Sequence, residues 1–315
     1  MANKLIVSAA PHITSADSTS KIMGRVCIAL LPTLIASVLI FGFQALLLTA
    51  VTVAACVVFE YAYCKLVGRD VTISDLSAVV TGLLLAFNLP AGLPVWMSLV
   101  GAFIAIVIIK QLFGGLGYNF ANPAIVGRIA MALGFTGAMT SYTYPENGID
   151  ALASATPLAV EETAQNAGSY VTLLLGNHGG VLGETCAITL LIGGIYLIWT
   201  KVISPTIPVT YLATVAVFSL LCGYDPIYQL LSGGLILGAF FMATDYVTSP
   251  TTDKGKLVFG IGLGVITMMI RHFGTMNEGV SFAILLMNLM VPYIEVLTRQ
   301  DKLGIAKVKK GGAAK

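Results

Sequence analysis

The sequence is poor in charged residues. Asp, Glu, Lys and Arg together account for 10% of its 315 residues, whereas soluble domains carry about 25%. This shortage excludes a soluble domain with an ordinary solvated surface. The formal net charge is only +2, and we expect no nucleic-acid partner.

Cysteine and histidine are also few, with five and three residues. The cysteines mostly fall inside apolar runs, and none forms the close pairs that metal or iron–sulfur ligation needs. The histidines lie far apart in the sequence, so we expect neither a disulfide nor a metal site. No paired-carboxylate, phosphate-loop or nucleophile–base pattern appears, and no catalytic residue is assigned. The residues concerned are Cys27, Cys56, Cys64, Cys186, Cys222, His12, His178 and His272.

Hydrophobic residues make up most of the sequence. The hydrophobic fraction is 57% and the mean hydropathy is +0.90, which is typical of membrane proteins. At roughly 20 residues for each span, the chain supplies about ten. We predict an all-α polytopic membrane protein without a cleavable signal peptide. Its spans lie near 24–43, 45–66, 75–91, 94–112, 122–138, 183–202, 206–223, 227–245, 255–271 and 279–297.

The basic residues orient these spans. Ten spans put both termini on the same side of the membrane. With a cytoplasmic N-terminus, 16 of the 17 Lys and Arg residues fall on the inner side or at inner helix ends, Arg128 among them. Only Arg271 falls outside, in agreement with the positive-inside rule. The Lys-rich tail either meets anionic lipid headgroups or a partner, or is simply solvated.

Ten spans divide into two halves of five, and an odd number inverts the second copy. Residues 81–87 (TGLLLAF) resemble 233–240 (GGLILGAF), and 109–114 (IKQLFG) resemble 270–274 (IRHFG). The predicted organisation begins with a cytoplasmic N-terminal segment (1–23) and a first five-helix repeat (24–138). An extracytoplasmic loop (139–182) then leads to a second, inverted five-helix repeat (183–297) and a basic cytoplasmic tail (298–315). Inverted repeats often place a binding site between the halves, which fits a transporter as well as a redox subunit.

The connection at 113–124 (FGGLGYNFANPA) is rich in glycine and asparagine. Its three glycines let the backbone turn tightly or approach a ligand. Asn119 and Asn122 could present amide groups to a planar heterocycle, or they could satisfy loose backbone groups in a tight turn. Asp245 lies in the connection between the eighth and ninth predicted spans. It could cap a helix, bind a cation or orient a ligand.

The polar loop from about 140 to 180 is the one long stretch that cannot lie in a membrane. Its charges are all acidic. Small residues fill 150–157 (DALASATP), so the hydroxyl of Thr156 is open to a modifying enzyme. On the residues alone, an unremarkable turn is the default interpretation.

These motifs together resemble the RnfD family, the membrane flavoprotein subunit of Rnf ferredoxin:NAD oxidoreductase complexes. The resemblance includes residues 8–12 (SAAPH), FGGLGYNFANPA, GGVLGET, ATDYVTSP and EGVSFAILLMN in one order. It implies that Thr156 is esterified to FMN by a flavin transferase, with Asp150, Ser154 and Ala155 as the recognition context. Ala153 and Tyr246 depart from the usual family residues. A second, noncovalent flavin such as riboflavin is implied near Asn119 and Asn122.

By the same resemblance, the chain relays electrons in a bacterial cytoplasmic (inner) membrane, coupled to Na⁺ or H⁺ movement, and is not active alone. The implied partners are the other Rnf subunits (A, B, C, E and G), especially the FMN-bearing G subunit, and membrane lipid. One alternative is an NqrB-type subunit of a sodium-pumping NADH:quinone reductase, although such proteins carry a longer segment before the first span. The other alternative is a solute transporter or channel built on the repeat.

Overall fold

The computed structural model describes residues 17–142, 170–176, 178–184, 186–274 and 279–299. Within these ranges every regular element is a helix, which confirms the predicted all-helical class. The first group of helices is α1 (Thr19–Phe41), α2 (Phe43–Val67), η1 (Ile73–Asp75), α3 (Ser77–Phe87), α4 (Val95–Phe103), η2 (Ile104–Gln111), α5 (Pro123–Gly134) and α6 (Thr136–Met139).

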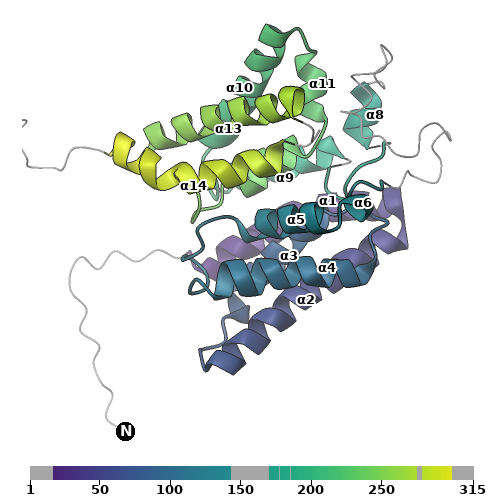
Figure 1. Cartoon of the computed structure of the whole chain (residues 1–315), viewed down its shortest axis with the longest axis vertical. Helices are drawn as coiled ribbons and strands as arrows, with labels where there is room; N and C mark the ends of the chain where they lie inside the picture. Colours follow the sequence, from purple (N-terminus) through teal and green to yellow (C-terminus); the bar gives the residue numbers. More distant parts are fainter. Residues whose placement is uncertain (1–16, 143–169, 177, 185, 275–278, 300–315) are drawn as a thin grey trace, which may run out of the picture.

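The second group begins after the polar segment. It contains α8 (Tyr170–Leu175), α9 (Ala187–Trp199), α10 (Thr206–Cys222), α11 (Pro226–Leu231), α12 (Leu235–Leu237), η3 (Gly238–Met242), α13 (Asp253–Phe273) and α14 (Val280–Thr298). Figure 1 shows α2 to α5 packed together below and α9 to α14 above. The two groups meet where α1 packs on α9 and where α5 packs on α14.

Several helices have the length and composition of membrane spans. In the described part of the chain, α1, α2, α13 and α14 are long and apolar enough to cross a bilayer, and shorter apolar helices accompany them. Large apolar side chains also cover the outside, as at Leu39, which is 80% exposed, and Leu221, which is 81% exposed. Such a surface suits lipid and not water, so the chain is a multi-pass membrane protein.

The helix termini mark two ends of the bundle. At one end, which we call the proximal end, α1 begins and α14 finishes. There Ser20 Oγ donates to Ser74 O of η1, and the Thr252 and Thr298 hydroxyls share a hydrogen bond of 2.9 Å. At the other end, the distal end, lie α6 and α8, on the right in Figure 1.

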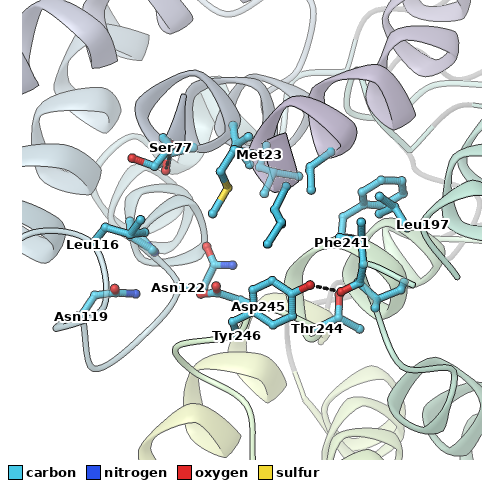
Figure 2. Close-up of a pocket in the computed structure, with 18 of the residues that line it drawn as sticks. Met23, Ser77, Leu116, Asn119, Asn122, Leu197, Phe241, Thr244, Asp245 and Tyr246 are labelled. Atoms are coloured by element: carbon cyan, nitrogen blue, oxygen red, sulfur yellow. Dashed lines mark hydrogen bonds between the residues drawn. The ribbon is translucent and has the colours of Figure 1, made fainter. Parts of the chain in front are cut away.

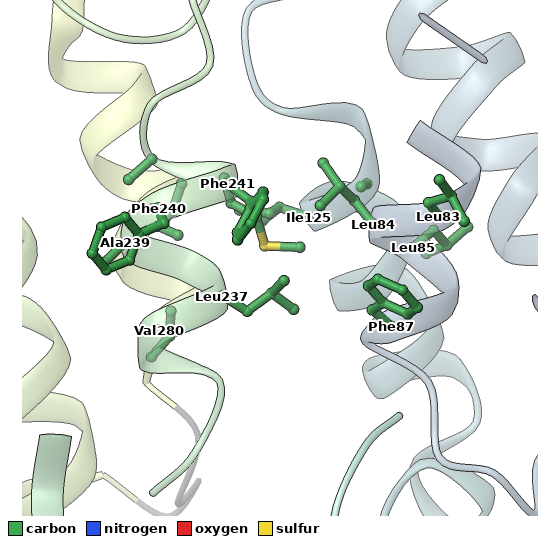
Figure 3. Packing of buried hydrophobic residues seen from close by; sticks show 14 of the residues in the cluster. Leu83, Leu84, Leu85, Phe87, Ile125, Leu237, Ala239, Phe240, Phe241 and Val280 are labelled. Atoms are coloured by element: carbon green, nitrogen blue, oxygen red, sulfur yellow. The ribbon is translucent and has the colours of Figure 1, made fainter. Parts of the chain in front are cut away.

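Two of the short helical segments are interrupted at a residue with positive φ. Leu76 (φ 62°) separates η1 from α3, and Gly233 (φ 58°) lies between α11 and α12. Further on, η2 and η3 are π-helices, which is the form that frequently marks functional sites. At the centre of the molecule α3 and α5 face α12 and η3, where Figure 3 shows Leu84 and Ile125 opposite Leu237 and Phe241.

One expectation about position needs correction. Arg128 was expected on the inner side or at an inner helix end, with the other basic residues, and it does not lie there. It lies inside α5, is only 8% exposed, and donates to Ser281 Oγ at the start of α14, toward the distal end. The segment predicted as a loop up to residue 182 also contributes packed structure, because Leu182 N donates to Leu89 O and α8 contacts α9.

Glycine permits the closest approach between the two groups. A Cβ added at Gly193 of α9 would lie 2.2 Å from the carbonyl oxygen of Ala29 in α1. The obstacle is backbone, so no side-chain rotation relieves the collision. Small residues at such contacts are typical of helix pairs in membranes.

We therefore expect Gly193→Ala to push α1 and α9 apart and to cost about 1–3 kcal/mol, the usual range for overpacking. The measurement is the midpoint of thermal unfolding in detergent. The matched control is Gly134→Ala at the end of α5, where the added Cβ meets no atom within 4 Å. Equal midpoints for the two variants would contradict the close contact.

Candidate functional site

A pocket lies between the two helix groups near the proximal end (Figure 2). Its unfilled volume, the open mouth included, is about 760 Å³. Apolar side chains such as Met23, Leu197 and Phe241 form much of the wall. The polar lining residues are Ser77, Thr81, Lys110, Asn119, Asn122, Thr244, Asp245 and Tyr246. Both groups of helices therefore contribute polar atoms to one cavity.

The glycine-rich connection between η2 and α5 carries Asn119 and Asn122 into this pocket. Gly114, Gly115 and Gly117 have φ values of 126°, 96° and 95°, a region that residues with a Cβ rarely adopt. The tight turn expected from the sequence is thus confirmed. It returns the chain to the bundle just before Pro123 opens α5.

Each of the two asparagines has a backbone partner and also lines the pocket. Asn122 caps α5 by accepting from Ala124 N at 3.1 Å, and its Nδ2 donates to Met242 O of the second group at 3.3 Å. Asn119 Nδ2 donates to Ala121 O at 3.0 Å. The two alternatives from the sequence are therefore compatible, because the turn uses part of each amide and leaves hydrogen-bonding capacity facing the cavity.

The second group supplies the opposite wall at residues 244–246. Asp245 Oδ2 accepts from Thr248 Oγ1 at 3.1 Å, so its carboxylate closes the turn that follows η3. The Tyr246 hydroxyl donates to Val202 O, as the dashed line in Figure 2 shows. Burial raises the pKa of the Tyr246 phenol, and the nearby Asp17 carboxylate adds to the rise. Tyr246 is therefore a neutral donor.

A buried ion pair stands behind the first wall. Lys110 Nζ of η2 lies 2.7 Å from Glu60 Oε2 of α2, and the two side chains are 2% and 0% exposed. Lys110 also donates to Ser77 Oγ at 2.6 Å. Thr72 Oγ1, on the outside, donates to Glu60 Oε1 at 2.7 Å. A buried charge pair of this kind needs such further hydrogen bonds to offset its desolvation.

Sequence reasoning missed this pair. Lys110 counted only among the basic residues that orient the spans, and Glu60 was assigned no role. The signal that was present is their opposite charge near the same side of the second and fourth predicted spans. Nothing in the sequence, however, states that those two spans pack together, as α2 and η2 do.

Arg271 performs a related task at the distal end. Its Nη1 donates to Gln229 O and Oε1 at 2.7 and 3.0 Å, and its Nη2 donates to Ser232 O and Gly233 O at 3.0 and 3.2 Å. These acceptors surround the interruption between α11 and α12. A fixed fork of donors suits several carbonyls at once.

The structure gives no position for Thr156, the residue predicted to carry covalent FMN, or for its recognition context. Thr156, Asp150, Ser154 and Ala155 lie outside the described residues. The described neighbours on the C-terminal side belong to α8, where the Tyr170 hydroxyl donates to Asp225 at the start of α11. α8 lies at the distal end, so the described part of this loop and the pocket lie at different ends of the bundle.

These features define a polytopic helical membrane protein with a largely apolar pocket, carrying a few polar groups, between two groups of helices. Comparison with known proteins then gives the family. The model of the NQR2, RnfD, RnfE family matches residues 6–304. The chain belongs to this family, and the resemblance inferred from its motifs is confirmed.

Individual relatives match over nearly the whole chain. The D subunit of the Na⁺-translocating ferredoxin:NAD⁺ oxidoreductase complex of Acetobacterium woodii is 48% identical, covering 98% of both chains. The D subunit of the proton-translocating ferredoxin:NAD⁺ oxidoreductase complex of Clostridium ljungdahlii is 41% identical, covering 96% of this chain and 97% of the relative. The D subunit of an ion-translocating oxidoreductase complex of Alcanivorax borkumensis is 36% identical, covering 98% and 99%.

The buried pair makes a testable claim about stability. Glu60→Gln leaves the Lys110 ammonium buried without its counter-charge, and we expect a loss of about 3–5 kcal/mol in the free energy of unfolding. Glu60→Gln combined with Lys110→Met removes both charges and is expected to lose much less. Denaturant or thermal unfolding in detergent measures both variants. If the double variant is as unstable as the single one, uncompensated charge is not the cause.

Proposed function

We propose that this chain is the D subunit of an ion-translocating ferredoxin:NAD oxidoreductase complex and relays electrons through flavin. The observation that carries the proposal is the family match across residues 6–304, together with relatives, one of them 48% identical, that are the D subunits of such complexes. The other subunits of the complex, including a G subunit with its own FMN, are the partners. The complex stands in a bacterial cytoplasmic membrane, and the isolated chain is inactive.

Thr156 carries FMN through a phosphoester bond in this proposal. Support comes from the sequence 150–157 (DALASATP), which matches the acceptor pattern of the family with Asp150, Ser154 and Ala155 around the threonine. A flavin transferase makes the bond. Distal placement of α8 and α6, whose helices flank this segment, agrees with an extracytoplasmic flavin.

A second, noncovalent flavin occupies the pocket at the proximal end. The fit rests on three features of the cavity: apolar walls, amide groups of Asn119 and Asn122, and a carboxylate at Asp245. An apolar cavity with a few convergent polar groups is the usual form of a cofactor site. The flavin would supply reversible uptake of electrons.

The chain's own residues hold and shield the ligand. Asn119 and Asn122 orient the polar edge of a planar heterocycle, because the turn fixes both amides on one wall. Met23, Leu84 and Phe241 exclude water from its apolar part. A dry site strengthens every electrostatic contact made within it.

The two helix groups are the halves of an inverted repeat of five spans each, with both termini cytoplasmic. Support comes from equivalent contacts: α2 packs on η2 in the first group as α10 packs on α13 in the second. The interruptions at Leu76 and Gly233 also become equivalent. This register differs from the sequence match, which set Thr81 against Gly233. A site between such halves is also the arrangement of solute transporters, and that alternative predicts a chain without flavin.

Covalent attachment predicts a fluorescent band. The wild-type chain, made in cells that contain the flavin transferase, is expected to fluoresce under ultraviolet light after denaturing electrophoresis. Thr156→Val removes the acceptor hydroxyl and should abolish the band, whereas Thr163→Val, in the same loop, should keep it. Mass spectrometry of the Thr156 peptide gives the site directly. Fluorescence that survives Thr156→Val would exclude this threonine as the acceptor.

The pocket predicts loss of the second flavin in a separate variant. Asn119→Ala removes one amide from the wall. Losing a hydrogen bond worth about 1–3 kcal/mol should raise the dissociation constant of the flavin roughly tenfold or more. The measurement is the flavin released from the purified complex by acid, with in-gel fluorescence of the covalent flavin unchanged. The control is Asn88→Ala, since Asn88 is buried and bonded to Leu84 O but does not line the pocket. Equal losses in both variants would count against a pocket ligand.

A further inference from the structure

One charged side chain in the pocket wall has no part in the function described so far. Lys110 is 1% exposed, yet it lines the cavity together with Ser77. We infer that Lys110 is the residue that sets the charge preference of this pocket, favouring a ligand that becomes negatively charged when it is reduced. The inference rests on the proposed second flavin and assigns a role that the asparagines cannot fulfil, since they carry no charge.

The hydrogen bonds of Lys110 leave it a donor for the ligand. An ammonium group has three N–H bonds and no acceptor. Among the described residues two acceptors are within reach, Glu60 Oε2 at 2.7 Å and Ser77 Oγ at 2.6 Å. The third N–H is therefore available to an acceptor atom in the cavity that Lys110 lines.

The order of the two charges gives the pocket its sign at this wall. Lys110 belongs to the pocket lining and Glu60 does not. A ligand therefore meets the ammonium first, with the carboxylate behind it. In a site of low dielectric constant this difference in distance has a larger effect on the energy than it would in water.

The opposite wall carries the carboxyl group of Asp245, the second charged residue of the pocket lining. Its side chain already accepts from Thr248, and Tyr246 beside it is a neutral phenol. An oxidised isoalloxazine carries one ring N–H between two carbonyl groups, so its pyrimidine ring can meet both walls. A carbonyl oxygen accepts from Lys110, and the N–H donates toward Asp245.

The charge preference follows from the electron balance. An oxidised isoalloxazine ring is neutral; uptake of two electrons and one proton leaves a ring with one negative charge. The electrons come from the reduced neighbouring centre of the proposed complex, and the proton comes from water. Lys110 keeps its proton throughout and forms no covalent bond. Its ammonium stabilises the charged ring more than the neutral one.

The test is the binding of riboflavin to the flavin-depleted complex, measured once with oxidised and once with chemically reduced riboflavin. The test variant is Glu60→Gln combined with Lys110→Met, which removes the ammonium without leaving a buried unpaired charge. The control is Thr81→Val, which alters a neutral residue of the same wall. A redox titration of the pocket flavin in the reloaded complex provides a second readout.

We expect the ratio of oxidised to reduced dissociation constants to fall at least tenfold in the double variant and to stay unchanged in Thr81→Val. Tenfold corresponds to a midpoint potential lower by about 30 mV for a two-electron couple. An unchanged ratio, or an equal change in Thr81→Val, would overturn the role of Lys110. If the wild-type complex neither releases a noncovalent flavin nor binds riboflavin, the second flavin itself is excluded, which is a separate failure.

Discussion

The structure depends on one constraint: inside a bilayer, every backbone polar group needs a partner within the protein. Continuous helices such as α1 and α13 meet it by themselves. The interrupted segments do not, and each has a basic side chain beside its break. Arg271 donates to the carbonyls around Gly233, and Lys110 bonds Ser77 directly after Leu76. The irregular backbone at Gly233 is therefore satisfied by a cation inside the protein, whereas after Leu76 the cation bonds the side chain of Ser77.

Bringing a cation inside creates a second requirement, which the molecule meets in two ways. Around Arg271 several neutral carbonyl dipoles are gathered, whereas Lys110 has a full counter-charge in Glu60. The second solution keeps a formal positive charge close to a cavity. Lys110, one half of the buried ion pair, is thus also the cation that can act on a ligand in the cavity.

Much of this arrangement could be predicted from the sequence. Apolar runs gave the positions of the helices, because lipid demands about 20 apolar residues per crossing. The glycines at 114, 115 and 117 indicated a turn, since three residues without a Cβ in such a short run have few other uses. Asn119 and Asn122 line one cavity because the turn that holds them is local.

The remaining features are non-local and could not be read from one chain. The pairing of Glu60 with Lys110 depends on which helices are neighbours, and apolar composition does not encode this. Arg128 was assigned to a helix end because its apolar neighbours in the sequence do not distinguish a buried position from a terminal one. The register that we propose between the halves differs from the sequence match, because it rests on positive φ at Leu76 and Gly233, which is a property of the folded backbone.

The π-helices η2 and η3 have a consequence for how this family can vary. A π-turn holds one residue more than an α-turn, and each residue rotates the chain by roughly 100° about the helix axis. Lys110 lies in η2, and Phe240 and Phe241 lie in η3. Deleting a single residue from either segment would restore an α-helix of nearly the same length but turn these side chains away from the cavity. Chain length in these two turns is thus under tighter restraint than the identity of most residues in them, and a one-residue deletion there would be a more damaging change than many substitutions.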